Sequence, residues 1–518
     1  AWRRRLLALG VVLLTLGAAS LPVFQAVILK MLPFDNKSEL QVVVDMPERT
    51  PMEQTQRVLT EMGHYLETVD EVDNWQAYAG TASPINFNGL VRQYYLRSEP
   101  YQGDIQVNLA SAEARSRPSH DITQALRGPL TEIADRYGAK VKMVEVPPGP
   151  PVMSPLVAEV YAADGFRRAE LANLIAGDMA NIEGLVDIDT TLEAPTRQWE
   201  VVVDRARAAR LGVSQAQVVA TLQTTLGGMN VSYLHDEQAK YPVPIRVILS
   251  EADKAQPSAL LSIKVRSRSG ELVPLASVAE VREADWMGAI YHKDLLPVTY
   301  VTADMAGEID SPLYGMFRMV SLLNEQEQAP EQFFIQQPPL PEKGTLKWDG
   351  EWQITYETFR DMGAAYSVGV FMIFVLLVAQ FRSYILPLVI MAPIPLTMIG
   401  IMPGHALLGK EFTATSMIGM IALAGIIVRN SILLVVFIKQ LLDEGMELEK
   451  AVVLAGAVRI KPIALTAVSA VVGAYFILSD PIFNGLAISL VFGLAMSTLF
   501  TVIVVPLLYY TLARCKWV

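Results

Sequence analysis

One arginine lies in the middle of an apolar segment that is long enough to cross a membrane. The segment runs from Met417 to Ile438, and Arg429 is near its midpoint. At about 1.5 Å of rise per residue it spans roughly 30 Å, the thickness of a bilayer's hydrocarbon core. A charge at that depth costs about 2.5–3.5 kcal/mol on insertion scales, so we interpret Arg429 as a functional residue facing a partner or a watery path. The alternative, a side chain that extends to the membrane surface, is disfavoured by its position halfway along the segment.

The composition indicates a protein that is partly in the membrane and partly globular. Of 518 residues, 52% are hydrophobic and 18% are charged, which is too apolar for a soluble protein and too polar for a chain wholly in lipid. The net charge of -11 argues against nucleic acid as a partner, because phosphate binding requires a basic face. The single cysteine, Cys515, excludes an internal disulfide. The chain starts with Ala1, and its first apolar segment is too long for a signal-peptide core, so we expect part of a longer polypeptide.

Six segments are apolar and long enough to span a bilayer. One lies within residues 1–32, after Arg3–Arg5, and five lie within residues 362–513. Basic residues in the loops gather on the side of Arg3–Arg5, with Lys410 as the exception, which predicts cytoplasmic termini and a large middle segment outside. We expect spans at residues 6–29, 363–381, 385–408, 417–438, 462–478 and 482–512, and a helix on the cytoplasmic surface at 441–459.

The middle of the chain alternates strand and helix patterns as soluble α+β domains do. Two strand–helix–strand units within residues 38–150 predict a split βαβ domain with its helices on one face of a sheet. A proline-rich linker follows at residues 147–151. Another such unit at 156–190 and a strong strand at 296–304 predict a second sheet, interrupted by an inserted β-rich module.

Arg429 has no carboxylate companion in this sequence. Through the cores of the six predicted spans it is the only Asp, Glu, Lys or Arg. A buried cation needs a compensating charge, so the acid has to come from another polypeptide or from a part of this one beyond these residues. Asn430, Ser431, Thr466 and Ser469 extend a hydrogen-bonded path beside Arg429 in one interpretation, and bond back to their own helices in the other.

No residue pattern supports an enzyme, a cofactor or a metal site. The five histidines lack metal-ligand spacing, and no nucleophile elbow, phosphate loop or paired-carboxylate signature is found. The soluble part has one feature that suggests a ligand, a run of aromatic residues. Rings on strands and loops can line a pocket for amphiphiles, and the alternative is that several belong to the core. The candidates for substrate binding are Trp75, Tyr78, Phe87 and Tyr94.

Several motifs together resemble the C-terminal half of a resistance-nodulation-division (RND) efflux pump. These pumps are the inner-membrane proton antiporters of tripartite multidrug exporters. The resemblance covers nearly the whole chain and is specific because the motifs occur together. It rests on Gly425–Phe437, on Arg459–Thr466, on Leu222–Gly228 and on the order of one span, a large loop and five spans.

The resemblance implies an α-helical membrane bundle of six spans plus an α+β periplasmic part. Two ferredoxin-like porter subdomains would take residues 38–150 and residues 152–197 with 290–350, and a docking subdomain would be inserted at 198–289. In the family, a basic residue in the fourth span of this half pairs with two aspartates of the other half. Arg429 matches that residue, Thr466 a relay threonine in the next span, and Arg459 an arginine at the cytoplasmic mouth.

Two positions depart from the family pattern. The family more often has lysine where this chain has Arg429. An arginine keeps its proton at any accessible pH, so it would act as a fixed counter-charge. The family also usually carries an acid at the position of Val436, which leaves open how that acid's role is filled here.

The function implied by the resemblance is export of amphiphilic compounds by proton antiport, in the bacterial inner membrane. The pump would be a homotrimer that binds a periplasmic adaptor and an outer-membrane channel, with a missing half supplying an intramembrane Asp pair. One alternative is a heavy-metal RND exporter, which needs methionine or acidic relays where we find scattered methionines such as Met143 and Met153. The other is an accessory or assembly protein without transport, against which the costly Arg429 argues.

The predicted orientation can be tested by labelling. Cysteines introduced as Glu325→Cys or Gln102→Cys should react with an impermeant reagent on intact spheroplasts, since both positions lie in the large external segment. Glu447→Cys should react only after permeabilisation, because it lies between two spans on the basic side. Labelling of Glu447→Cys from outside would overturn the orientation.

Overall fold

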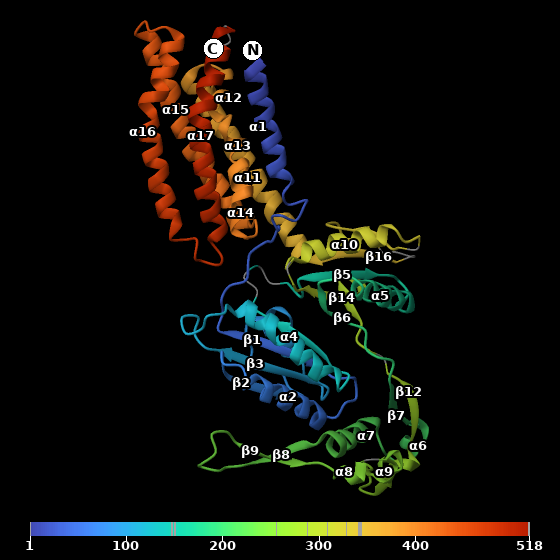
Figure 1. Cartoon of the computed structure of the whole chain (residues 1–518). Coiled ribbons are helices and arrows are strands. Elements are labelled where there is room, and N and C mark those ends of the chain that lie inside the picture. The colour runs from blue at the N-terminus through green and yellow to red at the C-terminus, as the bar shows by residue number, and fades with distance from the viewer. Residues whose placement is uncertain are drawn as a thin grey trace. The chain divides into compact units, whose positions relative to one another are not determined.

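A computed structural model describes residues 2–146, 149, 152–254, 256–286, 288–307, 309–327, 329–339 and 344–515, with residues 2–8 and 257 described by their backbone alone. The predicted proline linker at 147–151, apart from Gly149, lies outside the described residues. The chain forms two compact units, which we describe separately (Figure 1). The first unit comprises Ala1–Thr191 and Tyr291–Val518, and the second unit comprises Leu192–Ile290.

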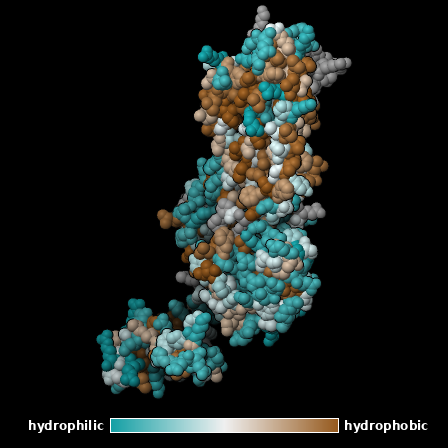
Figure 2. Space-filling model, turned by 90° about the vertical axis from the view of Figure 1, so that its left-hand side faces the viewer, coloured by the Kyte–Doolittle hydropathy of each residue, from teal (hydrophilic) through white to brown (hydrophobic). Residues whose placement is uncertain are grey.

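The first unit contains a bundle of apolar helices, which form the brown surface in Figure 2. Within the described residues, five segments are long and apolar enough to cross a membrane, and the shorter apolar helix α1 lies beside them (Figure 1). Breaks at Ala392 and Thr397 divide one of the five into three short helices, and Pro393 and Pro395 beside them lack the N–H that would continue the backbone ladder. The segments are α11 (Glu351–Phe381), α12 to α14 (Ile385–Met391, Pro393–Leu396 and Met398–Leu408), α15 (Ala414–Asp443), α16 (Leu448–Tyr475) and α17 (Asn484–Arg514), and α1 is Trp2–Ser20.

Three boundaries predicted from sequence are wrong. Helix α11 begins at Glu351 and not at residue 363. Helix α1 ends at Ser20, short of the predicted limit at residue 32, because the chain turns at Pro22 and Gln25 has a left-handed φ of 59°. Helix α16 begins at Leu448 and not at Pro462, so residues 448–459 of the predicted surface helix are the first part of α16 and not a separate helix. Pro462 lies inside α16, where a membrane helix tolerates proline because neighbouring groups satisfy the freed carbonyl.

The first soluble domain is a four-stranded antiparallel sheet with two helices on one face. The strand order is β2-β3-β1-β4, which together with the helix positions is the arrangement of a split βαβ domain. The hydrophobic core of this domain lies between the sheet and the two helices. Alternate strand residues, such as Val42 and Ile105, point into this core. The elements are β1 (Glu39–Asp45), α2 (Met52–Leu66), β2 (Val72–Ala79), β3 (Gln102–Leu109), α4 (Ser119–Asp135) and β4 (Lys140–Val144).

The second soluble domain is a six-stranded sheet built from chain segments on either side of the second unit. Strand β14 pairs antiparallel with β5, β6 and β13, and β16 joins β5 on its other side. Glu159 is fully buried in this sheet and pairs with Lys293 and Lys347, which compensate its charge. The elements are β5 (Leu156–Tyr161), α5 (Gly165–Ala180), β6 (Leu185–Thr190), β13 (Tyr291–Lys293), β14 (Leu296–Met305), α10 (Pro312–Asn324), β15 (Glu331–Phe333) and β16 (Thr345–Gly350).

The second unit has its own small core. Strands β7 (Arg197–Val203) and β12 (Ala279–Asp285) pair and lead into a cluster that includes Val218, Leu275 and Val278. A two-stranded hairpin of β8 and β9 exposes its side chains on both faces. The other elements are α6 (Arg205–Arg210), α7 (Gln215–Leu222), β8 (Met229–Leu234), β9 (Val243–Val247), α8 (Glu251–Lys254), α9 (Pro257–Ser262), β10 (Lys264–Arg266) and β11 (Leu272–Pro274).

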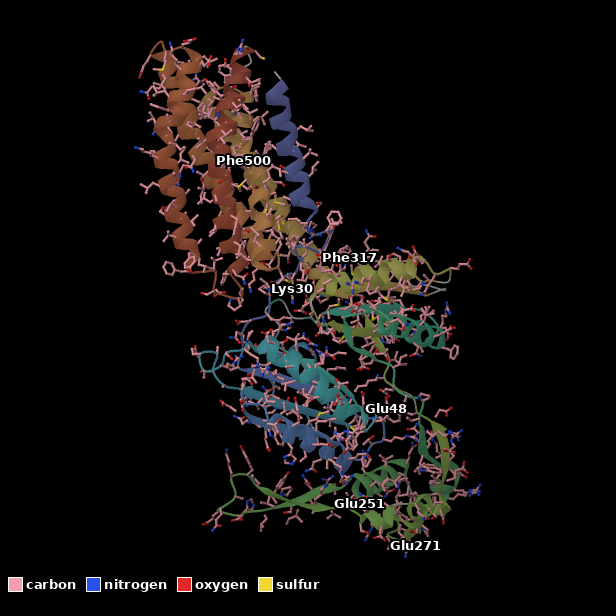
Figure 3. The ribbon with its side chains drawn as sticks, viewed as in Figure 1. Lys30, Glu48, Glu251, Glu271, Phe317 and Phe500 are labelled. Atoms are coloured by element: carbon pink, nitrogen blue, oxygen red, sulfur yellow. The ribbon has the colours of Figure 1, made fainter. Side chains whose placement is uncertain are left out.

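A charged junction joins the helical bundle to both soluble domains of the first unit. Lys30, between the bundle and the α+β part in Figure 3, is 3% exposed, and its Nζ lies 2.7 Å from Asp310, just before α10. The Nδ1 of His120, in α4, lies 2.8 Å from Glu145, and its Nε2 lies 3.3 Å from Asp310. Phe34 stacks on the His120 ring at a centroid distance of 4.5 Å. Each of the three parts of the unit therefore contributes a group to the junction.

Protonated His120 stabilises this junction. Burial lowers the pKa of His120, but the hydrogen bond to Glu145 and the charges of Glu145 and Asp310 together raise it above its ordinary value of 6.5. The stabilisation is therefore complete below about pH 6.5 and is lost as the pH rises through the higher pKa of the folded state.

This pKa shift predicts pH-dependent stability. The midpoint of thermal unfolding of the chain in detergent should drop on His120→Gln most strongly below pH 6.5, and the difference should shrink above the raised pKa. His64→Gln is the control, because His64 is exposed and lies 3.4 Å from its single carboxylate neighbour. A His120→Gln effect of equal size at pH 6 and pH 9 would contradict this role.

Candidate functional site

Arg429 lies on a stripe of α15 that the rest of the described chain leaves uncovered. The side chain of Arg429 is exposed, and so are those of Ile418 and Leu433, each 46% exposed. Members of the stripe are three or four residues apart, which places them on one side of the helix. They are Ile418, Ile421, Ala422, Gly425, Arg429, Leu433, Val436 and Gln440. Among the described residues, none forms an ion pair with Arg429.

The structure places Asn430 and Ser431 on the buried side of α15. Asn430 is 4% exposed and Ser431 is fully buried, whereas Arg429 next to them is exposed. The Oγ of Ser431 finds no hydrogen-bond partner in the described part of the chain. The predicted path from Arg429 through Asn430 is therefore not formed by these groups within this chain.

The hydroxyls of Thr466 and Ser469 in α16 bond to carbonyls of their own helix. Thr466 donates its hydroxyl to the carbonyl of Ile463 at 2.9 Å, and Ser469 donates to the carbonyl of Thr466 at 3.0 Å. Both hydroxyls thus bond back to their own helix, as the second interpretation of the sequence expected. The hydroxyl oxygen of Thr466 can still accept a hydrogen bond, because its side chain is exposed.

Arg459 contacts an aromatic ring on the neighbouring helix. Its guanidinium carbon lies 4.7 Å from the centre of the Phe437 ring, a cation–π geometry. Phe437 is eight residues beyond Arg429, or about 12 Å along α15 toward the predicted cytoplasmic end. Arg459 therefore meets α15 about 12 Å from Arg429 along the helix axis, and the two cations are separate groups.

The aromatic candidates of the soluble part fall on two faces of the first sheet. Trp75 packs against α2 at Gly63, which has no side chain: a Cβ added there would lie 2.3 Å from the Trp75 ring. The Nε1 of Trp75 donates to Glu67 at 3.2 Å. Tyr78 is three residues further along β2 and so lies on the opposite face, where its hydroxyl donates to Gln76 at 3.1 Å. Trp75 is therefore part of the core and Tyr78 is not.

The face that carries Tyr78 is covered by residues 80–101, which we call the aromatic loop. This loop joins β2 to β3 and contains Phe87, which is 45% exposed, and the half-buried Tyr94. The exposed aliphatic side chains of the loop were not predicted, and the signal that could have found them is an apolar residue in a segment rich in Gly, Pro and Asn. They are Ile85 at 72%, Leu90 at 62% and Leu96 at 62% exposed.

A family model described as the AcrB/AcrD/AcrF family matches residues 2–513 of this chain. The chain belongs to this family. The RND resemblance recognised in the sequence motifs is therefore confirmed over nearly the whole length. Membership agrees with the observed combination of apolar helices and α+β domains.

Individual proteins are similar to this chain at 20% to 26% identity. The swarming motility protein SwrC of Bacillus subtilis (strain 168) is 26% identical over 345 residues, which is 65% of this chain and 31% of SwrC. Two crystal forms of a heavy metal efflux pump share the fold with a TM-score of 0.78, at 20% and 21% identity over 98% of this chain. The chain spans about half of the pump's length, 50% and 51% in the two forms.

Proposed function

We propose that this chain is the C-terminal half of a proton-driven exporter of amphiphilic compounds. The proposal rests on the uncovered stripe of α15, which has a cation halfway along a helix long enough to cross the membrane. A cation facing lipid there has no compensation, so the stripe fits a second helical bundle that brings carboxylates. The solved pump, about twice as long as this chain, supports the same division into halves.

In the proposed mechanism, Arg429 holds two carboxylates of the missing half in their ionised form. An opposite charge within about 4–6 Å favours ionisation of a carboxylate. Protonation of one carboxylate weakens its attraction to Arg429 and lets the helices shift, while Arg429 itself stays charged. Thr466 would orient a carboxylate by hydrogen bonding, and Arg459 would extend the positive potential toward the cytoplasm.

The proposed assembly follows the family. Helix α1 and the five longer segments would make six spans with cytoplasmic termini, and the soluble domains would be periplasmic. The first and second soluble domains would be porter subdomains, and the second unit a docking subdomain that reaches an outer-membrane channel and a periplasmic adaptor. A homotrimer in the bacterial inner membrane completes the proposal.

The aromatic loop is our candidate for substrate contact. Tyr78, Phe87 and Tyr94 lie on or under it, together with exposed aliphatic side chains. A patch of exposed apolar side chains on a soluble surface fits the binding of amphiphiles. Trp75 is not part of this proposed surface, because it packs against α2.

Export of metal ions is the second candidate, since the solved relatives are heavy metal efflux pumps. At 20% and 21% identity this similarity supports a shared fold, but it does not identify the substrate. In the ranges that the structure describes, no three His, Cys, Asp or Glu side chains are grouped to hold a metal ion. The aromatic loop therefore favours amphiphiles over metal ions.

Substitution of Arg429 tests the mechanism, with the missing half supplied. Arg429→Ala should abolish export with near-normal membrane insertion, because one of two adjacent carboxylates then stays protonated. Arg429→Lys should retain much of the export, and Thr466→Ala should weaken it less than Arg429→Ala does. Leu433→Ala, on the same stripe, is the matched control for lost packing and should reduce export much less than Arg429→Ala does. Normal export by the Arg429→Ala protein would leave the arginine a structural role at most.

Substitutions in and below the aromatic loop test substrate contact. Phe87→Ala and Tyr78→Ala should change resistance to some hydrophobic compounds more than others at normal expression, since Phe87 is exposed and the half-buried Tyr78 lies outside the hydrophobic core. Trp75→Ala is the contrasting variant and should lower expression and all resistances together, because it removes core packing. Uniform loss with poor expression for Phe87→Ala would assign that residue to the core as well.

A further inference from the structure

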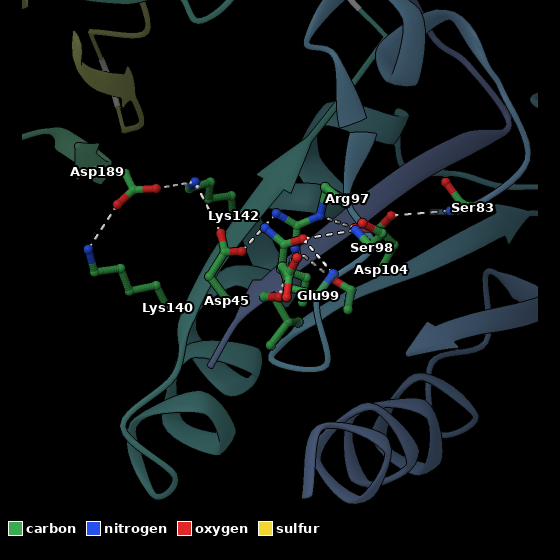
Figure 4. Close-up of polar contacts among 12 residues, drawn as sticks. Asp45, Ser83, Arg97, Ser98, Glu99, Asp104, Lys140, Lys142 and Asp189 are labelled. Carbon is green, nitrogen blue, oxygen red and sulfur yellow. Dashed lines mark hydrogen bonds and ion pairs between the residues drawn. The ribbon is translucent and has the colours of Figure 1, made fainter. Parts of the chain in front are cut away.

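The aromatic loop is held to the sheet by polar contacts. Asp104, in β3, is fully buried and accepts hydrogen bonds from both ends of the loop. Its Oδ2 accepts from the backbone N–H of Ser83 at 3.4 Å, and its Oδ1 accepts from Nε of Arg97 at 3.0 Å (Figure 4). One carboxylate thus closes a loop of 22 residues, counted from Gly80 to Tyr101.

Arg97 makes more contacts than this one. It is 9% exposed, and it also donates to Asp45 at 2.7 Å and to the backbone carbonyls of Val44 at 2.9 Å and Gly103 at 3.3 Å. These contacts use the fork of a planar guanidinium, which a lysine ammonium cannot reproduce. The last turn of the loop is therefore fixed against two strands, β1 and β3.

Apart from Tyr101 at its end, which packs against the hydrophobic core, polar contacts rather than apolar burial hold the loop. The hydrophobic core of the domain lies on the other face of the sheet, toward α2 and α4. Near its start the loop is fixed by amides, since Gln41 donates to Ser83 at 3.3 Å and Asn86 donates to Gln106 at 3.1 Å. Its aliphatic side chains are left pointing outward, as the 72% exposure of Ile85 illustrates.

Asp45 extends the polar contacts to the second soluble domain. Its Oδ2 lies 3.3 Å from Nζ of Lys142 in β4, and Lys142 also pairs with Asp189 in β6 (Figure 4). Lys140 lies 2.8 Å from the same Asp189. Although burial raises the pKa of Asp45, the charges of Arg97 and Lys142 hold it below its ordinary value, so Asp45 is ionised at neutral pH.

We propose that Arg97 is a positioning residue for the aromatic loop, and that Asp45 and Lys142 link the loop position to the contact between the two soluble domains. If the two soluble domains separate, Lys142 loses its ion pair with Asp189. Asp45 is then its remaining partner in this network, and Lys142 competes with Arg97 for that carboxylate. The loop is then held less firmly. Under the proposed function, on which this step rests, Arg97 would thereby influence which compounds the loop admits.

Spin labelling of the loop tests the positioning role in the full chain in detergent. Cys515 is the single cysteine, so Cys515→Ser with Leu90→Cys gives one label site on an exposed loop position. Arg97→Lys and the isosteric Asp104→Asn should each raise the mobile fraction of the label by about fivefold or more, because buried donors or acceptors lose their partners. Asp189→Asn, at the rim of the contact between the two soluble domains, should raise the mobile fraction of the label by about twofold.

The matched control is Arg117→Lys in the same domain. Arg117 also makes a fork, with Nε and Nη2 at 2.7 and 2.8 Å from the two oxygens of Glu71, but it lies outside the loop. Its substitution should leave the label immobile. An immobile label in folded Arg97→Lys or Asp104→Asn protein overturns the positioning role, and an unchanged label in Asp189→Asn overturns the link to the second domain.

Export measurements separate this inference from the proposed function. In the assembled transporter, Arg97→Lys should change export of different amphiphiles by unequal factors, while Arg117→Lys should not. A mobile loop with unchanged relative export supports the positioning role and contradicts substrate contact by the loop. An immobile loop contradicts the positioning role whatever the export shows.

Discussion

The uncompensated charge of Arg429 is the constraint on which the membrane part depends. A guanidinium at half depth costs about 2.5–3.5 kcal/mol unless a carboxylate or water meets it, and the described chain offers no carboxylate there. The cation stands on the exposed stripe of α15, while the polar groups beside it are buried or satisfied within their own helices. The arrangement suits a helix that completes a charged site with a second bundle.

The soluble part uses charge in a different way. In the first sheet, apolar packing fixes the strands and helices, and a set of buried polar contacts fixes the aromatic loop on the opposite face. Removing one member of such a network leaves a buried partner unsatisfied, so the network is sensitive to single substitutions. Charged contacts, His120–Asp310 among them, also join the two soluble domains, and Lys30 joins Asp310 to the chain leaving α1. Relative movement of these parts would exchange ion pairs rather than open an apolar core.

The sequence predicts the arginine, the apolar segments and the strand–helix–strand units, because length and periodicity carry that information. It cannot predict that Arg429 is exposed while Asn430 is buried, since apolar residues lie around most of α15 and its sequence does not distinguish a face that packs on the bundle from one that does not. The start of α16 was predicted at Pro462, because proline often begins a helix in soluble proteins. Inside a membrane helix proline is tolerated, so the prediction was wrong. The contacts of Arg97 join residues up to 53 positions apart, which local patterns do not encode.

The most direct measurement is a structure of the complete transporter, containing this chain and the half that covers the α15 stripe. The account predicts a carboxylate oxygen of the other half within about 4 Å of the Arg429 guanidinium, the distance of an ion pair. It also predicts that the helices of that half cover Leu433 and Val436. An Arg429 side chain that faces lipid, or a covering surface without a carboxylate at that depth, would contradict the account.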